Sequence, residues 1–231
     1  MTLDGKVALI TGAKGGLGSS VTSAFLAAGA TVAGVSRSIR DSDFDHPRFF
    51  AVPAELSSSD AARSVVDSVL ARAEQIDILV HLVGGFTGGK AVADTDDSTL
   101  EEMLEVNVKS AFYMAKAVLG HMRDRGAGRV LAIGSRAAVE SNGDVGAYSA
   151  SKAALIALIR AIASENAKFG ITANIILPGT MDTAANRRAM PNADYKKWVQ
   201  LDQVATLIVS LASDELSQVT GAAIPIYGRD I

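Results

Sequence analysis

The chain has 231 residues, of which 48% are hydrophobic and 20% are charged, with a net charge of −3 and no cysteine. This length and balance fit one well-packed α/β domain, and the small negative charge gives no reason to expect nucleic acid or an anionic membrane as a partner. The lack of cysteine excludes disulfides, thiolate metal sites and thiol nucleophiles.

Short apolar runs rich in β-branched residues alternate with helical patterns along the chain, which predicts a doubly wound Rossmann domain. We expect one domain over residues 1–231, with a parallel sheet covered by helices on both faces. Its seven strands are expected at Lys6–Thr11, Thr31–Ser36, Arg48–Val52, Ile76–Leu82, Arg129–Gly134, Thr172–Leu177 and Ala223–Ile226. Helices are expected near Leu17–Ala28, Asp60–Glu74, Leu100–Arg125, Ala147–Phe169 and Val204–Ala212.

Two polar insertions interrupt this alternation, Asp41–Pro47 and Ala184–Trp198. The second is the natural substrate lid, at about residues 184–200. The start, Met1–Gly5, has no charged and apolar regions of the kind found in signal peptides. The longest apolar helix, near Ala153–Ala163, is interrupted by Arg160, so we expect a cytoplasmic protein.

The first strand leads into a glycine-rich turn and then into a helix. Glycines at this point let the backbone turn tightly and approach a pyrophosphate, whose charge would lie at the helix N-terminus. The alternative is a glycine turn with a purely structural role. We expect a dinucleotide site that includes Gly12, Lys14, Gly15, Gly16, Leu17 and Gly18.

The end of the second strand bears on the choice between NAD and NADP. Ser36 stands where an NAD-binding protein usually carries an acid that holds the ribose hydroxyls. Arg37, together with Lys14, could pair with a 2′-phosphate instead. NADP(H) is therefore the favoured cofactor, and NAD(H) is the alternative. Arg37 could also be an ordinary solvated arginine at a strand end, with no role in cofactor binding.

Ser135, Tyr148 and Lys152 follow the fifth expected strand in one strand-to-helix passage. The spacing of Tyr148 and Lys152 puts them one turn apart on one helix face, where a lysine lowers the pKa of a phenol. We expect Tyr148 to deliver a proton while hydride passes from a nicotinamide to a carbonyl or imine carbon. Ser135 would donate to the substrate oxygen. The Tyr-x-x-x-Lys pattern alone is weak, because it also arises by chance.

The glycine spacing, Asn107, Ser135 and Tyr148-x-x-x-Lys152, in that order, resemble the short-chain dehydrogenase/reductase family over essentially the whole chain. The resemblance implies an NAD(P)H-dependent oxidoreductase in which Asn107 interrupts its helix and holds a water that relays protons to Lys152. Lys152 would also bind the nicotinamide ribose. Dimers or tetramers are implied, which fits the surplus of apolar residues on the two longest helices. The loop on the nicotinamide side would comprise Pro178, Gly179, Thr180, Met181 and Thr183.

The chain departs from the family pattern after the third and fourth strands. The family usually has Asn-Asn-Ala-Gly where this chain has His81-Leu82-Val83-Gly84. Val83, Gly84 and Gly85 keep the close approach to the cofactor, but the hydrogen bonds of the missing asparagines must come from elsewhere. Glu55, followed by Leu56, replaces a shorter acid on the adenine side.

Three histidines, His46, His81 and His121, share no metal-ligand spacing. We therefore expect them to be structural and expect no metal site.

Two stretches, Gly84–Gly89 and Asp182–Trp198, are similar to dihydropteridine reductase, a short-chain branch that reduces quinonoid pterins. They point to Phe86 and Trp198 on the substrate side, although Trp198 could equally pack in the core or a subunit interface. Ser135 and Arg37 do not fit that branch. Three functions stay open: a reductase of small carbonyl compounds, a pterin reductase, and a non-catalytic NADP-sensing protein.

Overall fold

The computed structural model describes residues 2–229, which form one parallel sheet of seven strands in the order β3-β2-β1-β4-β5-β6-β7. The order reverses between β1 and β4, and such a switch point opens a crevice at the carboxyl ends of the strands. The predicted doubly wound fold is confirmed. The strands are β1 (Val7–Thr11), β2 (Thr31–Ser36), β3 (Phe49–Pro53), β4 (Ile78–His81), β5 (Gly128–Ile133), β6 (Ile171–Pro178) and β7 (Ala223–Ile226).

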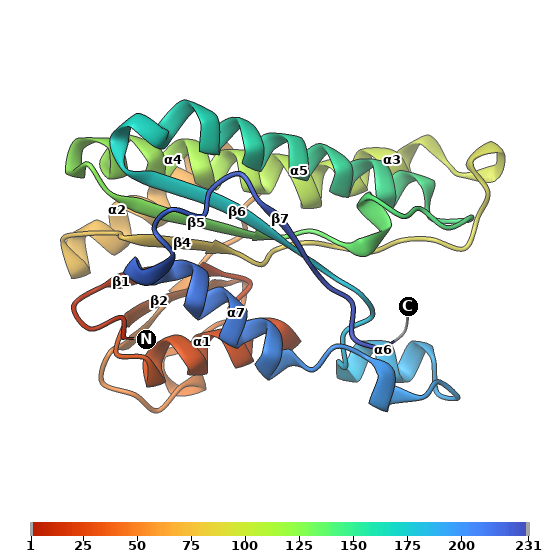
Figure 1. Cartoon of the computed structure of the whole chain (residues 1–231), viewed down its shortest axis with the longest axis horizontal. Helices are drawn as coiled ribbons and strands as arrows, with labels where there is room; N and C mark the ends of the chain where they lie inside the picture. The colour runs from red at the N-terminus through yellow and green to blue at the C-terminus, as the bar shows by residue number, and fades with distance from the viewer. Residues whose placement is uncertain (1, 230–231) are drawn as a thin grey trace.

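Helices cover both faces of the sheet (Figure 1). One face carries α1 (Gly16–Ala27) and α7 (Leu201–Ala212), and the other carries α2 (Ser59–Ala73), α4 (Ser110–Arg125) and α5 (Gly146–Asn166). Successive strand residues point to opposite faces, so Leu9 packs under the second group of helices and Ile10 under the first. Both side chains are fully buried, which explains why the strands read as unbroken apolar runs.

The helix expected at Leu100–Arg125 is present, and it is interrupted at Asn107, as the family resemblance implies. The structure has α3 (Asp97–Leu104), a π-helical turn at Glu105–Lys109 and then α4. Asn107 lies inside the π-helical turn and is fully buried, so a polar side chain rather than a Gly or Pro marks the break. π-Helical turns of this kind recur at functional sites.

α5 and the turn after it, Gly146–Phe169, are long and apolar enough to cross a membrane by length and composition. Half of the most apolar window is buried inside the protein, where α5 packs against β6. The core helix of a soluble protein passes the same test, so this feature is weak evidence for a membrane span.

The segment between β6 and α7 contains α6 (Ala184–Ala189) and a 3₁₀ turn at Tyr195–Lys197. Its two ends are tied together by a parallel bridge between Met181 and Val199. The Val199 N–H donates to the Thr180 carbonyl at 2.8 Å, and the Asp182 N–H donates to the Val199 carbonyl at 2.9 Å. Residues 182–198 therefore form a closed loop beside the carboxyl ends of the strands (Figure 1).

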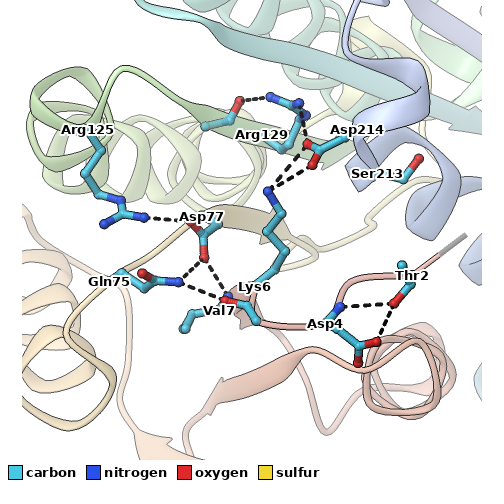
Figure 2. Close-up of polar contacts among 12 residues, drawn as sticks. Thr2, Asp4, Lys6, Val7, Gln75, Asp77, Arg125, Arg129, Ser213 and Asp214 are labelled. Atoms are coloured by element: carbon cyan, nitrogen blue, oxygen red, sulfur yellow. Dashed lines mark hydrogen bonds and ion pairs between the residues drawn. The ribbon is translucent and has the colours of Figure 1, made fainter.

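A polar network joins the amino ends of the central strands (Figure 2). Asp77, just before β4, accepts hydrogen bonds from the Val7 N–H at 2.7 Å and from Gln75 Nε2 at 2.8 Å, and its other oxygen pairs with Arg125 at 3.2 Å. Nearby, Lys6 and Arg129 each approach Asp214 to 3.1 Å. The network ties β1, β4 and β5 to the helices that flank them at the end of the sheet away from the switch-point crevice.

We expect Asp77→Ala to lower the free energy of unfolding by about 1 to 3 kcal/mol, because it leaves the Val7 N–H without its acceptor. Urea unfolding measures the change. Asp60→Ala is the control, because Asp60 forms an exposed pair with Arg63 on α2, of a kind that contributes about 0 to 1 kcal/mol. Equal losses in the two variants would contradict a structural role for Asp77.

Candidate active site

The predicted site residues gather at the carboxyl ends of the strands, on both sides of the switch point. The glycine-rich turn follows β1, Ser36 ends β2, Val83 to Gly85 follow β4, and Ser135 follows β5. The Pro178 to Thr183 segment follows β6. Parallel strands bring these segments, far apart in the sequence, to one edge of the sheet.

The glycine-rich turn has the geometry of a phosphate cradle. Gly12 has a φ of +70°, and a Cβ on it would lie 3.1 Å from the Leu82 carbonyl carbon. A Cβ on Gly18 would overlap the Gly12 carbonyl oxygen. The first turn of α1 has no acidic residue and its N-cap, Gly15, has no side chain, so the N–H groups of that turn are left for an anion. These residues fit the pyrophosphate of a dinucleotide.

The same cleft extends to the lid. A Cβ on Gly16 would lie 3.4 Å from Thr183 Cγ2, so the glycine-rich turn and the expected nicotinamide-side loop face each other at van der Waals distance. Gly179 is held by β7, because its N–H donates to the Ile226 carbonyl at 3.0 Å and a Cβ on it would meet the Tyr227 carbonyl oxygen at 2.7 Å. Both sides of the cleft are therefore fixed by backbone packing.

Charged side chains line the rim beyond Ser36, and they are paired. Ser36 Oγ accepts the Lys14 N–H at 3.2 Å, which ties the end of β2 to the glycine-rich turn. Lys14 Nζ, expected as a partner for a 2′-phosphate, lies 2.9 Å from Asp43. Arg37 approaches Glu55 to 3.9 Å, and both side chains are exposed. Asp43 is a residue that sequence reasoning missed, and nothing in the local pattern marked it.

Asn107 makes hydrogen bonds to the cleft wall after β4. Its Oδ1 accepts the Gly85 N–H at 3.0 Å, and its Nδ2 donates to the Gly85 carbonyl at 3.1 Å and to Ser151 Oγ at 3.0 Å. Ser151 in turn donates to the Tyr148 carbonyl at 2.7 Å. Asn107 thus links the cleft wall after β4 to the first turns of α5.

Lys152 is buried, and its Nζ donates to the Ile133 carbonyl at 2.9 Å. Burial lowers the pKa of Lys152 to about 8. The same Nζ lies 6.0 Å from the centroid of the Tyr148 ring and 3.1 Å from where a Cβ on Gly84 would stand. The ammonium therefore lies between the phenol and the glycine wall of the dinucleotide cleft.

Tyr148 has a pKa above its ordinary value, because burial raises it more than a hydrogen bond with Ser135 lowers it. The expectation that Lys152 lowers the pKa of Tyr148 is not met in this structure. The physical reason is that Lys152 is directed to the Ile133 carbonyl rather than to the phenol oxygen. Tyr148 is consequently protonated at neutral pH and can act as a proton donor, with Ser135 bound beside it.

Two aromatic residues expected on the substrate side differ in their surroundings. Phe86 is 66% exposed and meets Tyr148 edge to face, with ring centroids 4.9 Å apart. Trp198 is only 5% exposed and packs on Tyr195 within the lid, at a centroid distance of 4.7 Å. Trp198 is therefore a buried residue with a ring contact inside the lid, whereas Phe86 is open to solvent beside Tyr148.

His81 takes the place of the first asparagine of the family motif and makes the sheet contacts there. Its Nδ1 lies 3.0 Å from Thr11 Oγ1 and its Nε2 lies 3.2 Å from Ser110 Oγ. Ser110 also donates to the Val106 carbonyl at 2.6 Å, inside the π-helical turn. Burial first, and the charge of Lys152 second, lower the pKa of His81 to about 3, so the ring is neutral.

The other two histidines make backbone contacts away from this cleft. His121 Nε2 accepts the Ile76 N–H and His46 Nδ1 accepts the Arg48 N–H, each at 3.2 Å. Within residues 2–229, no group of three or more His, Asp or Glu side chains is arranged to hold a metal ion.

The model of the family described as short chain dehydrogenase matches residues 6–194. The chain belongs to the short-chain dehydrogenase family. It is therefore an oxidoreductase that uses a nicotinamide cofactor, and the predicted family, fold and class of activity are confirmed. That cofactor supplies or accepts hydride when it is bound, and the glycine cradle and cleft described above fit it.

Individual relatives cover nearly the whole chain. This short-chain dehydrogenase is 29% identical to a 3-oxoacyl-(acyl-carrier-protein) reductase of Salmonella typhimurium, over 99% of this chain and 98% of the relative. It is 29% identical to an acetoacetyl-CoA reductase of Allochromatium vinosum, over 96% and 97% of the two chains. Its fold matches a 3-ketoacyl-(acyl-carrier-protein) reductase from Brucella melitensis complexed with NADH, with a TM-score of 0.89, 25% identity and full coverage of both chains.

The buried, neutral His81 makes the short-chain dehydrogenase fold sensitive to acid. The unfolded chain takes up a proton near the ordinary pKa of 6.5, whereas folded His81 does so only near 3, so stability is lost as the pH falls below about 6.5. We expect His81→Asn to remove roughly 2 kcal/mol of the loss between pH 8 and pH 5, as measured by urea unfolding at each pH. His46→Asn is the control, and parallel pH curves for wild type and His81→Asn would contradict the assignment.

A methyl group on Gly84 would stand 2.8 Å from Asn107 Oδ1 and 3.1 Å from Lys152 Nζ. We expect Gly84→Ala to lower kcat/KM by about tenfold to a hundredfold, because displacing these two groups by a fraction of an ångström misplaces the site. Circular dichroism and thermal unfolding should show that the fold persists. Gly120→Ala on α4 is the control, since nothing lies within 4 Å of the added Cβ, and a full loss there as well would contradict a local effect.

Proposed function

We propose that this chain is an NADPH-preferring reductase of small carbonyl compounds, with Tyr148 as the proton donor. The observation that carries the proposal is the position of Lys152. Its ammonium stands beside the Tyr148 ring on one side and beside Gly84 of the dinucleotide cleft on the other. A proton donor and a hydride donor can therefore meet one substrate carbon and its oxygen in a single cleft.

Each residue of the site has a distinct task in this reaction. Ser135 donates to the substrate oxygen and orients it. Tyr148 gives its phenolic proton to that oxygen as negative charge develops there, and its raised pKa keeps the proton in place until then. Lys152, with a pKa of about 8, exchanges protons near neutral pH and can restore the phenol, while Asn107 holds the cleft wall at Gly85.

The substrate class is proposed from the relatives and from the space beside Tyr148. The names of two relatives specify 3-oxoacyl and acetoacetyl thioesters, which carry a ketone two carbons from the thioester carbon. A cavity of about 250 Å³ lies between residues 87–99 and the turn at residues 144–147, which directly precedes Tyr148 in the chain. Part of a small 3-oxo ester would fit this cavity while its ketone lies at Tyr148 and Ser135.

The exposed edge-to-face ring of Phe86 favours a second candidate, the reduction of a flat heterocycle such as a quinonoid pterin. A planar ring system stacks well on an aromatic side chain. This candidate uses the same proton donor, so it differs from the first only in the substrate.

The preference for NADPH is proposed from Arg37 and Lys14 near the end of β2 and from the lack of an acid at Ser36. The exposed Leu100 and Phe112 on α3 and α4 support a homo-oligomer, either a dimer or a tetramer. We also propose that the chain acts in the cytoplasm as one catalytic domain with its lid at about residues 184–200.

The test follows NADPH and NADH oxidation against 3-oxoacyl esters, small ketones and a quinonoid dihydropterin. We expect Tyr148→Phe to lower kcat by about 10²- to 10⁴-fold, and Ser135→Ala by about 10²- to 10³-fold, with little change in cofactor affinity measured by fluorescence titration. Tyr113→Phe on α4 is the matched control for loss of a phenol.

The outcomes separate the candidates. Activity on the 3-oxoacyl esters or ketones supports the first function, and activity confined to the pterin supports the second. Cofactor binding without turnover of any substrate would instead indicate a non-catalytic sensor of the cofactor. Full activity of Tyr148→Phe on a good carbonyl substrate would refute its role as the proton donor.

A further inference from the structure

We propose that Asp43 weakens the preference for NADPH over NADH by holding Lys14 and opposing a 2′-phosphate at the rim of the cofactor cleft. This inference rests on the proposed function, since it concerns the cofactor of the same site. It assigns a specificity-determining role to a residue of the loop after β2 that lies 29 positions from its partner along the chain.

The ion pair between Lys14 and Asp43 is held in place by several contacts. Lys14 Nζ lies 2.9 Å from one oxygen of Asp43 and 3.0 Å from the other, and it also donates to the Ser38 carbonyl at 3.1 Å. Asp43 is itself held, because the Arg40 N–H donates to its carboxylate at 2.8 Å within a short 3₁₀ turn. Its side chain is only 23% exposed, so the carboxylate has a defined position beside the glycine-rich turn.

The backbone puts this ion pair beside the part of the cleft where a ribose phosphate would bind. The Lys14 N–H donates to Ser36 Oγ at 3.2 Å, and Ser36 occupies the strand end where an acid would hold the ribose hydroxyls in an NAD-specific protein. Asp43 therefore supplies from the loop a carboxylate close to the position where Ser36 has none.

Two cations at this rim each pair with a carboxylate. Lys14 is paired with Asp43, and Arg37 is paired with Glu55 at 3.9 Å. A 2′-phosphate brings close to two negative charges and needs both cations, so it must compete with the two carboxylates for them. The hydroxyls of NADH need no cation, and a carboxylate can accept hydrogen bonds from them.

The two carboxylates are not equivalent. Arg37 and Glu55 are both mostly exposed and their contact is long, so solvent screens the pair. The Lys14–Asp43 pair is shorter and anchored at both ends by backbone contacts. The hydrogen bond from Lys14 also holds the pKa of Asp43 below its ordinary value, so the carboxylate stays charged at neutral pH.

The decisive variant is Asp43→Asn, which removes the charge but keeps an oxygen for the Arg40 N–H. We expect the dissociation constant of NADPH to fall by about three- to tenfold and that of NADH to stay within about twofold, so the ratio of the two shifts toward NADPH. Isothermal titration calorimetry on the full chain measures both, without turnover. Adenosine 2′,5′-bisphosphate, which lacks the nicotinamide, should show the same gain as NADPH.

The control is Asp45→Asn, which removes one negative charge from the same exposed loop, two residues away. We expect it to leave the NADPH to NADH ratio within about twofold of wild type, because Asp45 forms no ion pair with any residue between 2 and 229. An equal shift in both variants would mean that only the net charge of the loop matters, and would overturn the specific role of Asp43.

A double-mutant cycle with Lys14→Gln tests whether Asp43 acts through Lys14. In the Lys14→Gln background, we expect Asp43→Asn to improve NADPH binding by a smaller factor than in wild type. An unchanged ratio in Asp43→Asn, with NADH still bound, overturns this inference and leaves the proposed function intact. Failure of the wild-type chain to bind either nucleotide would overturn both.

Discussion

The side chain of Asn107 holds the two halves of the site together. Its amide forms hydrogen bonds with both the N–H and the carbonyl of Gly85 and with Ser151 Oγ. These bonds connect the cleft wall after β4 to the start of α5. Tyr148 and Lys152 lie within those first turns of α5. A fully buried amide needs all of its hydrogen bonds satisfied, and this requirement fixes the distance between the proton donor and the cofactor cleft.

The π-helical turn contains Asn107, whose side chain binds Gly85. Beside it, Ser110 donates to the Val106 carbonyl, and His81 contacts Ser110 and Thr11. These contacts continue into β1 and β4, the two strands at the switch point. The sheet, the distorted helix and the reaction centre are therefore one connected polar network inside an apolar core.

Burial sets the protonation states at the centre of the protein. It raises the pKa of Tyr148, lowers that of Lys152 to about 8 and lowers that of His81 to about 3. A side chain whose pKa is shifted by burial makes the fold less stable in its charged state. Such shifted pKa values are typical of functional sites. At the rim of the cleft, by contrast, the charged side chains form ion pairs, Lys14 with Asp43 and Arg37 with Glu55.

The sequence by itself determined the fold and the family, and it singled out residues that the structure gathers at the carboxyl ends of the strands. Strands buried on both faces must be apolar runs, glycines must stand where the backbone turns under a phosphate, and a tyrosine and a lysine four residues apart must share a helix face. All of these are local patterns, and they can be read without knowing what lies across the sheet.

Only the tertiary structure decided which distant groups meet. The pairing of Lys14 with Asp43 and the direction of Lys152 toward Ile133 depend on contacts between separate segments. The side-chain contacts of Asn107 belong to the same class, because its amide binds Gly85 and Ser151 from other segments. The raised pKa of Tyr148 likewise follows from burial, and burial is a property of the folded chain that no local spacing encodes.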